Sequence, residues 1–254
     1  MVRIAAVGDI HVGEDCRGRF RPHFSAVGDR ADVLLLAGDL TNYGMPAQAQ
    51  VLADELEDTP VPVVAVLGNH DYHCGHADVV RSTLERVGVI VLEGESVTLE
   101  IGSCRLGIAG LKGFGGGFPG ACGHKFGEPE MKAFVQLTED AAKALEAQLR
   151  SLDSDYRIAL MHYAPVKDTL AGERLEIFPF LGAYQLGEAV DTGGAHLALH
   201  GHAHHGSVKG VTPGGVPVRN VAMPLIQKPY AIFTLGAAGA ADAAHDPHAE
   251  TAST

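Results

Sequence analysis

The stretch that decides the fold is VPVVAVLGNHD, residues 61–71. Its first part, Val61–Leu67, is an apolar run rich in β-branched side chains, which predicts a buried strand. Gly68 follows and permits a tight turn, so that Asn-His-Asp at 69–71 comes directly after the strand end. At ordinary residue usage, Gly-Asn-His-Asp is expected by chance in on the order of one chain in a thousand. The stretch therefore predicts a strand that delivers polar side chains to a site.

Four other apolar runs end in the same types of residue. Each is short enough for a buried strand and is followed closely by aspartate or histidine. The runs with their polar ends are Arg3–Val7 with Asp9 and His11, Val33–Leu36 with Asp39, Arg157–Met161 with His162, and Leu197–Leu199 with His200, His202 and His204. Since the carboxyl ends of parallel strands meet at one edge of an α/β sheet, we expect these side chains to converge there.

Aspartate, asparagine and histidine together form a mixed oxygen and nitrogen ligand set. Such a set suits Mn, Fe or Zn better than a metal that prefers thiolates. Two such ions that share one carboxylate can turn a bridging water into a nucleophile near neutral pH, and they can hold the oxygens of a phosphoryl group. By itself, Asp9-Ile10-His11 also fits a surface turn, and His162 fits a buried core histidine. Because all five motifs occur in order, each at the end of an apolar run, we expect one common site.

The five motifs read D-x-H, G-D, G-N-H-D, H and G-H-x-H between Asp9 and His204. This arrangement resembles the calcineurin-like metallophosphoesterase superfamily. The resemblance implies a four-layer α/β/β/α sandwich of two mixed sheets, two bound metal ions (Mn, Fe or Zn) and hydrolysis of a phosphate ester. It also implies that Asp9, His11, Asp39 and His204 hold one metal, that Asp39 bridges, and that Asn69, His162 and His202 complete the second site. His70 would act on the substrate as a catalytic residue together with Asp39.

One motif departs from the protein serine/threonine phosphatases of that superfamily. Those enzymes continue the second motif as G-D-x-x-D-R-G, whereas this chain has Asn42 and Tyr43 at the second Asp and the Arg. The Asn42 side chain cannot give His70 a negative partner, and Tyr43 cannot bind phosphate as arginine does. A protein-phosphatase identity is therefore not expected. The Gly-Asn-His-Asp form of the third motif, with Asp71, resembles the cyclic-nucleotide phosphodiesterase branch, although it is not exclusive to that branch.

The rest of the chain alternates strands and helices, which predicts a largely parallel α/β domain over residues 1–235. We expect one helix after Pro46, a second that carries Val80 and Leu84, and a third that begins near Thr138. Strand-like runs follow at Val89–Leu92, Ser96–Ile101, Arg105–Leu111, His196–Leu199, Gly206–Lys209, Val216–Asn220 and Ala231–Leu235. The three runs between Val89 and Leu111 suggest a meander or hairpins.

Two segments lack periodicity. Gly113–Gly123 holds six glycines, so we expect an irregular, mobile loop. The Ala/Gly/His/Asp-rich tail at 236–254 looks disordered, and we expect its His245 and His248 to be solvated. Next to the first segment, Phe114 and His124 are candidates to cover a leaving group, and His73 could line the pocket with Asn69 and His70. Ordinary loop positions remain the alternative for these three side chains.

Composition limits the function further. The chain has 254 residues, of which 46% are hydrophobic, and a formal net charge of −12. This charge, without a basic stripe, argues against a nucleic-acid polymer as partner. No apolar run reaches the ~20 residues of a membrane span, and the early start of the first strand leaves no room for a signal peptide, so we expect a cytoplasmic protein. The oligomeric state stays open, a homo-oligomer included.

The sequence therefore predicts a dinuclear phosphoesterase that attacks a small phosphate monoester or diester with a metal-bridging hydroxide, with nucleotides or cyclic nucleotides as the leading class. Two alternatives remain. A non-catalytic protein-interaction scaffold on the same fold would be expected to have lost ligands or His70, and both are intact. A nuclease of the same superfamily would be expected to carry a basic stripe.

Overall fold

The computed structural model describes residues 1–236 and 239–242 and contains two six-stranded mixed sheets. In the first sheet β1 to β4 are parallel, while β13 and β14 add antiparallel strands at one edge. In spatial order its strands are β14 (Gly239–Asp242), β13 (Ala231–Gly236), β1 (Val2–Val7), β2 (Val33–Ala37), β3 (Val63–Val66) and β4 (Ile90–Val91).

The second sheet has a parallel centre and an antiparallel strand at each edge. Its order is β11 (Lys209–Val211), β12 (Pro217–Asn220), β10 (Leu197–His200), β9 (Tyr156–Met161), β6 (Cys104–Leu111) and β5 (Glu95–Ile101). A separate two-stranded hairpin pairs β7 (Gly117–Phe118) with β8 (Ala121–Cys122).

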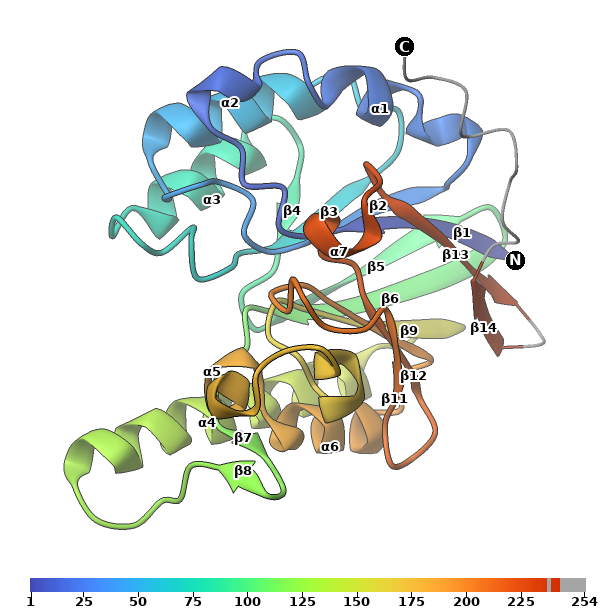
Figure 1. Ribbon diagram of the computed structural model, residues 1–254. Coiled ribbons are helices and arrows are strands. Elements are labelled where there is room, and N and C mark those ends of the chain that lie inside the picture. The colour runs from blue at the N-terminus through green and yellow to red at the C-terminus, as the bar shows by residue number, and fades with distance from the viewer. Residues whose placement is uncertain (237–238, 243–254) are drawn as a thin grey trace.

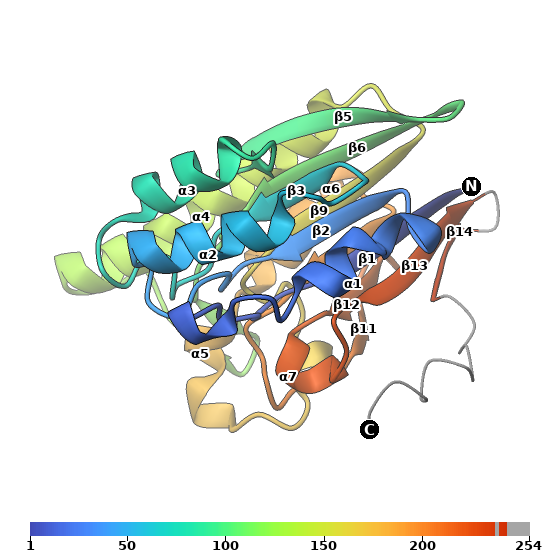
Figure 2. The same ribbon diagram turned by 90° about the horizontal axis from the view of Figure 1, so that it is seen from above.

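Helices cover the outer face of each sheet, so the layers run α/β/β/α (Figures 1 and 2). Above the first sheet lie α1 (Arg21–Ser25), α2 (Pro46–Leu56) and α3 (Ala77–Glu85), and below the second lie α4 (Pro129–Ser151) and α6 (Tyr184–Gly193). The short helices α5 (Phe178–Leu181) and α7 (Met223–Ile226) stand at the sheet ends. The predicted four-layer sandwich is confirmed.

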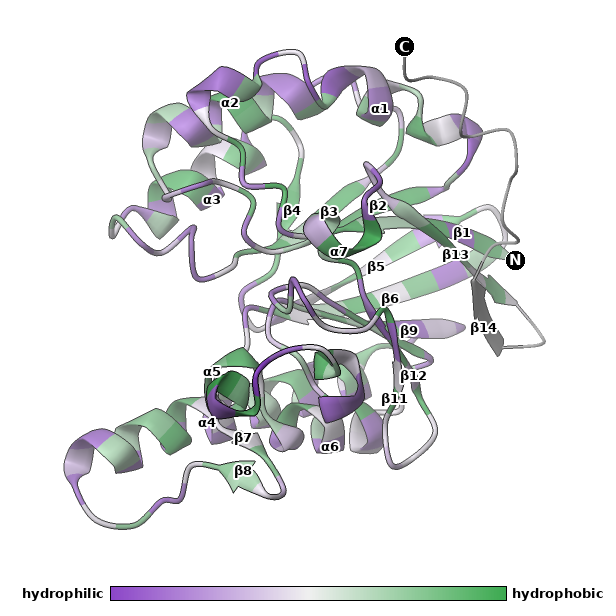
Figure 3. Ribbon diagram, viewed as in Figure 1, coloured by the Kyte–Doolittle hydropathy of each residue, from purple (hydrophilic) through white to green (hydrophobic). Residues whose placement is uncertain are grey.

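Strand alternation explains why the two sheets stack. In β1 and β2, Ile4 and Leu35 face the second sheet and pack in the central core, whereas Ala5 and Leu34 face the helices. Both faces of these strands are therefore buried, which matches their nearly continuous apolar sequences. Hydrophobic colour accordingly follows the sheets and the inner helix faces in Figure 3.

Three predicted elements differ from the structure. The third helix begins at Pro129 rather than near Thr138, because Pro129 and Glu130 form a favourable first turn. Thr138 is instead buried in mid-helix, where its hydroxyl donates a hydrogen bond to the carbonyl of Gly115. The glycine-rich segment is not wholly irregular, since it contains the β7–β8 hairpin. No strand covers Gly206–Lys209 as a whole; β11 begins only at its last residue.

The run between Val89 and Leu111 is divided between the sheets. β4 joins the first sheet beside β3, and only β5 and β6 form the expected hairpin. At the other end of the chain, β14 extends the first sheet beyond the domain boundary expected at residue 235. His245 and His248 lie outside the described residues. Within the described part, no helix is both long and apolar enough to cross a bilayer.

We expect Leu35→Ala to lower the free energy of unfolding by about 2–5 kcal/mol, because its side chain is fully buried between the sheets. Urea titration followed by circular dichroism measures the change. The control is Leu137→Ala on α4, whose side chain is 57% exposed and whose truncation should alter stability by less than about 0.5 kcal/mol. Equal losses in the two variants would contradict the central core.

Candidate metal centre

The polar ends of five strands from both sheets converge on one place. Asp9, His11, Asp39 and Asn69 follow strands of the first sheet, and His162, His202 and His204 follow strands of the second. Three groups of donor atoms form there, each with its atoms within 4.8 Å of one another. These groups are Asp9, His11 and His204; His11, Asp39 and His70; and Asp39, His162 and His202. We call the seven predicted ligand residues the Asp39 cluster.

Asp39 stands at the middle of the cluster and is only 2% exposed. Its Oδ1 lies 3.3 Å from Nε2 of His162, and its Oδ2 lies 3.8 Å from Nε2 of His11. The two carboxylate oxygens thus face histidines that come from different sheets. This is the geometry that a carboxylate shared by two cations requires.

The backbone of the cluster is held in an unusual conformation. Four non-glycine residues have positive φ, namely Asp9 (56°), His11 (44°), Asp39 (49°) and His202 (71°). An L residue pays about 1–2 kcal/mol in this left-handed region. Such strain persists only where surrounding contacts enforce it, and it concentrates at functional sites.

Asp71 is one of the contacts that enforce this backbone. Its buried carboxylate accepts hydrogen bonds from the backbone amides of Leu40, Thr41 and Gly68 and from the Thr41 hydroxyl. Burial raises the pKa of Asp71 to about 6, although these hydrogen bonds oppose the rise. Asp71 therefore ties the loop after β2 to the loop after β3.

The ring nitrogens of His11 indicate whether the site fits a metal ion. Both of its ring nitrogens are buried without a hydrogen-bond partner among the described residues. Burial lowers the pKa of His11 to about 4, so the ring is neutral at pH 7 and keeps one free lone pair. A buried lone pair without a partner costs free energy, and a metal ion satisfies it.

His162, which follows a strand of the second sheet, also has a lone pair that a metal ion would satisfy. Burial lowers its pKa to about 3, so the neutral ring carries one proton. Each ring nitrogen has an acceptor beside it, the Ala37 carbonyl at 3.0 Å from Nδ1 and Oδ1 of Asn69 at 3.0 Å from Nε2, but the one proton can be donated to only one of them. When Nδ1 donates to the carbonyl, Nε2 and the Asn69 oxygen present two lone pairs to each other, which a cation between them satisfies.

His202 is oriented by a backbone group outside the cluster. Its Nε2 lies 3.1 Å from the carbonyl of Phe180, to which it donates a hydrogen bond. Burial lowers the pKa of His202 to about 3, so the ring is neutral and Nδ1 is left free to bind a metal. Its backbone amide also donates to both oxygens of Asp9.

Asp9 and His204 form the remaining pair. Nε2 of His204 lies 2.8 Å from Oδ1 of Asp9, and this hydrogen bond is the main reason why the pKa of His204 is raised. Burial raises the pKa of Asp9 to about 6. Both partners are groups whose charge a bound cation would change, so this pair, like the three neutral histidines, fits a metal site.

His70 lies at the edge of the cluster with one ring nitrogen fixed. Its Nδ1 lies 2.7 Å from the backbone carbonyl of Asn42, and its backbone amide donates to Oδ1 of Asp39 at 2.8 Å. Nε2 is 4.0 Å from Oδ2 of Asp39. The sequence indicated that the Asn42 side chain could not serve His70; the carbonyl of the same residue orients the ring instead.

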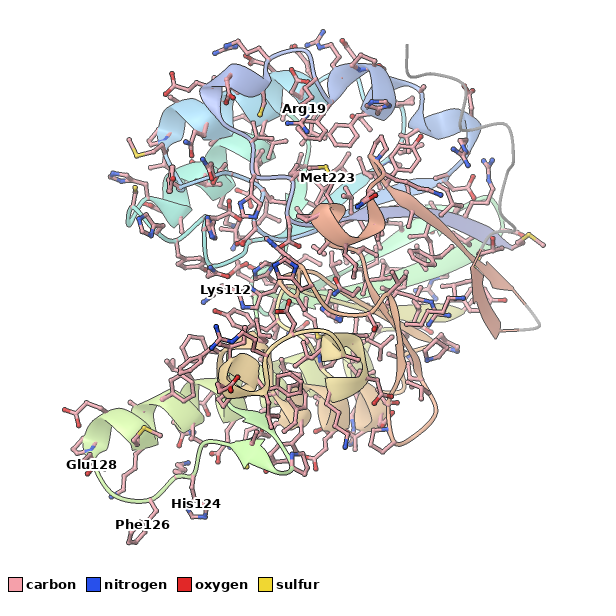
Figure 4. All side chains as sticks on the ribbon, in the orientation of Figure 1. Arg19, Lys112, His124, Phe126, Glu128 and Met223 are labelled. Carbon is pink, nitrogen blue, oxygen red and sulfur yellow. The ribbon has the colours of Figure 1, made fainter. Side chains whose placement is uncertain are left out.

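The three other substrate-binding candidates lie at different distances from the cluster. The ring of His73 is 5.7 Å from Tyr43, whose ring stacks on His70 at 6.5 Å. Phe114 contacts Tyr163 at 5.9 Å. His124 does not cover the site as expected, because it lies beside Phe126 at the outer tip of the molecule (Figure 4). The chain after β8 runs outward to α4 and carries His124 away from the ligands.

Sequence reasoning missed two residues beside the cluster. Tyr163 lies 4.5 Å from His202 and 5.5 Å from His162, measured between ring centroids. Lys112, the residue after β6, accepts the backbone amides of His162 and Tyr163 on its carbonyl. A strand-end rule that included lysine and tyrosine would have found both.

Comparisons with known proteins identify the family of this chain. The model of the calcineurin-like phosphoesterase family matches residues 2–206. A probable cyclic nucleotide phosphodiesterase from Synechococcus is 36% identical over 78 residues, which span 27% of this chain and only 31% of that relative.

Solved structures show the same fold at low identity. Phosphopantetheinyl hydrolase from Mycobacterium tuberculosis has a TM-score of 0.65 at 16% identity, covering 86% of this chain and 88% of that one. A putative 5′-nucleotidase from Staphylococcus aureus has a TM-score of 0.57 at 15% identity, covering 94% of this chain and 52% of that one. At these identities the likeness concerns the fold alone.

Gly68→Ala should weaken metal binding although it removes no ligand. A Cβ at this position would lie 2.1 Å from both the amide nitrogen and Oδ1 of Asp39, so Asp39 would have to move. We expect metal affinity to fall about 10–100-fold, as for other residues that support a ligand. Titration with Mn²⁺ by calorimetry measures it. Gly123→Ala, whose Cβ would have its nearest contact at 3.6 Å, should bind like the wild type; equal affinities for all three proteins would contradict this account.

Proposed function

Because this chain belongs to the calcineurin-like phosphoesterase family, we propose that it uses two metal ions at the Asp39 cluster to hydrolyse a small phosphate ester. The observation that carries the proposal is Asp39 itself. Its two oxygens face His162 on one side and His11 on the other, at 3.3 and 3.8 Å. Few arrangements other than a shared pair of cations make use of a buried carboxylate surrounded by neutral imidazoles.

The donor set divides into two sites. Asp9, His11, Asp39 and His204 would hold one ion, and Asp39, Asn69, His162 and His202 would hold the other. Bound there, Mn, Fe or Zn would activate water and neutralise charge on the phosphoryl oxygens. The protein's own part is to keep His11, His162 and His202 neutral and correctly oriented, so that lone pairs rather than protons face the ions.

His70 is suited to handle the proton of the leaving group. The Asn42 carbonyl fixes Nδ1 as a donor, and the other nitrogen faces the cluster beside Asp39. From Nε2, a protonated His70 would donate to the leaving oxygen as the ester bond breaks. Because the backbone amide of His70 also binds Asp39, the ring keeps a fixed position relative to the shared carboxylate.

We further propose a nucleotide or cyclic nucleotide as substrate. Two features support this class: the partial similarity to a probable cyclic nucleotide phosphodiesterase, and an aromatic rim next to His70. In that rim Tyr43 is 48% exposed and stands between His70 and His73, where a base could stack. Comparing adenosine 5′-monophosphate with cyclic AMP tests monoester against diester.

Asp39→Asn should abolish both metal binding and turnover. One charge that serves two ions is lost, and like-charge repulsion between the ions is no longer offset. Metal content after dialysis and hydrolysis of p-nitrophenyl phosphate and bis-p-nitrophenyl phosphate with Mn²⁺ are the measurements. Asp78→Asn, an exposed carboxylate on α3, is the control and should match the wild type.

If the wild type with Mn²⁺ hydrolyses neither compound, the phosphoesterase proposal fails and the scaffold alternative gains. If it degrades plasmid DNA instead, the nuclease alternative gains.

His70→Asn should retain both ions but lower kcat about 10²–10⁴-fold, the usual contribution of a general acid or base. Metal analysis and steady-state kinetics on the same preparation separate the two effects. His124→Asn at the outer tip makes the same exchange away from the cluster and should leave kcat unchanged. A His70→Asn variant with normal kcat would remove His70 from the mechanism.

A further inference from the structure

Lys112 places a cation next to the Asp39 cluster that the proposed chemistry does not use. The residue follows β6, at the boundary between the two halves of the molecule (Figure 4). Its carbonyl accepts the backbone amides of His162 and Tyr163, which fixes the start of its side chain beside a predicted metal ligand. The backbone at position 112 is therefore held next to the site.

Three aromatic rings surround the Lys112 amine. Nζ lies 4.6 Å from the ring centroid of Tyr72, 5.3 Å from that of Phe114 and 5.9 Å from that of Tyr163. Tyr163 in turn contacts the rings of His162 and His202. The ring of Tyr163 thus lies between the amine and the predicted metal ligands His162 and His202.

This amine forms no direct ion pair within the part of the chain that the structure describes, although the charges of Glu93 and Asp39 act on it. Among the described residues it has no hydrogen-bond acceptor and no carboxylate within ion-pair distance, although burial lowers its pKa. Glu93 is the nearest acidic residue in electrostatic terms, but its two oxygens accept hydrogen bonds from the Tyr72 hydroxyl and the Leu67 amide. Aromatic faces stabilise a cation only partly, so three ammonium donors remain available to a ligand.

We propose that Lys112, framed by Tyr72, Phe114 and Tyr163, binds a second anionic group of the substrate, a phosphate or carboxylate next to the ester that is cleaved. The inference rests on the proposed function, because it assumes that the scissile phosphate occupies the Asp39 cluster. Within the proposed class of phosphate esters and nucleotides, it favours molecules with two anionic groups over those with a single phosphate, such as adenosine 5′-monophosphate and cyclic AMP.

Binding of two matched probes tests the proposal without turnover. Propane-1,3-bisphosphonate and propylphosphonate share one phosphonate for the metals and differ in the second anion. With the Mn²⁺-loaded protein, calorimetry should give about 10-fold tighter binding of the bisphosphonate, the value of one charge-assisted hydrogen bond. In Lys112→Met this preference should shrink to whatever the second phosphonate gains from the metal ions alone. Lys112→Arg keeps the positive charge and should retain the preference.

The control is Lys143→Met, which removes an exposed lysine on α4 and should keep the wild-type preference. If Lys112→Met does not fold, Lys112→Gln has similar length without the charge and serves in its place. An unchanged preference in the neutral variants would overturn the proposal. So would an equal loss of affinity for both probes, because Lys112 would then act on the shared phosphonate or on the structure alone.

The outcomes separate this inference from the proposed function. A protein that hydrolyses p-nitrophenyl phosphate but binds both probes equally retains the phosphoesterase function and loses the second anion site. A protein that hydrolyses no ester but prefers the bisphosphonate through Lys112 retains the anion site and loses the enzymatic function.

Discussion

The Asp39 cluster depends on a backbone that is held at positive φ, a region that L residues rarely adopt. Asp9, His11, Asp39 and His202 all adopt left-handed conformations, each at a cost of about 1–2 kcal/mol. Hydrogen bonds between neighbouring loops offset this cost: Asp9 and His11 donate their amides to the carbonyls of Gly38 and Asp39. The Asp71 carboxylate adds three more bonds between the loops after β2 and β3, and a fourth to Gly68 within its own loop. The strain is thus supported by the packing of the whole sheet edge.

Close contact between the sheets depends on glycines at the same edge. A Cβ on Gly38 would lie 2.6 Å from Nδ1 of His162, and one on Gly201 would lie 2.2 Å from Oδ2 of Asp9. Each glycine comes from one sheet and each histidine or aspartate that it contacts comes from the other. Any side chain at these positions would push the sheets apart and separate the two halves of the ligand set.

Burial sets the electrostatic character of the site. It keeps His11, His162 and His202 neutral, so these three rings add no positive charge beside the carboxylates of the cluster. The protein as a whole carries a formal charge of −12, which would repel an anionic substrate. Two bound cations and the Lys112 amine would reverse the sign locally, which would let an acidic protein bind the anionic substrate that we propose.

The sequence by itself determined the strands that end in polar residues, because apolar runs and their terminal motifs are local features. The layered α/β architecture followed from the order of these strands and from the family resemblance. It missed the first turns of α4, where proline and tertiary packing extend the helix to Pro129, and it misplaced His124, whose position depends on the path of the β7–β8 hairpin. Only the tertiary structure decided that the Asn42 carbonyl orients His70, and that Lys112 lies against the rings of Tyr72 and Tyr163, which come from distant segments. A linear pattern encodes which residues end a strand; contacts across two sheets exist only once both have packed.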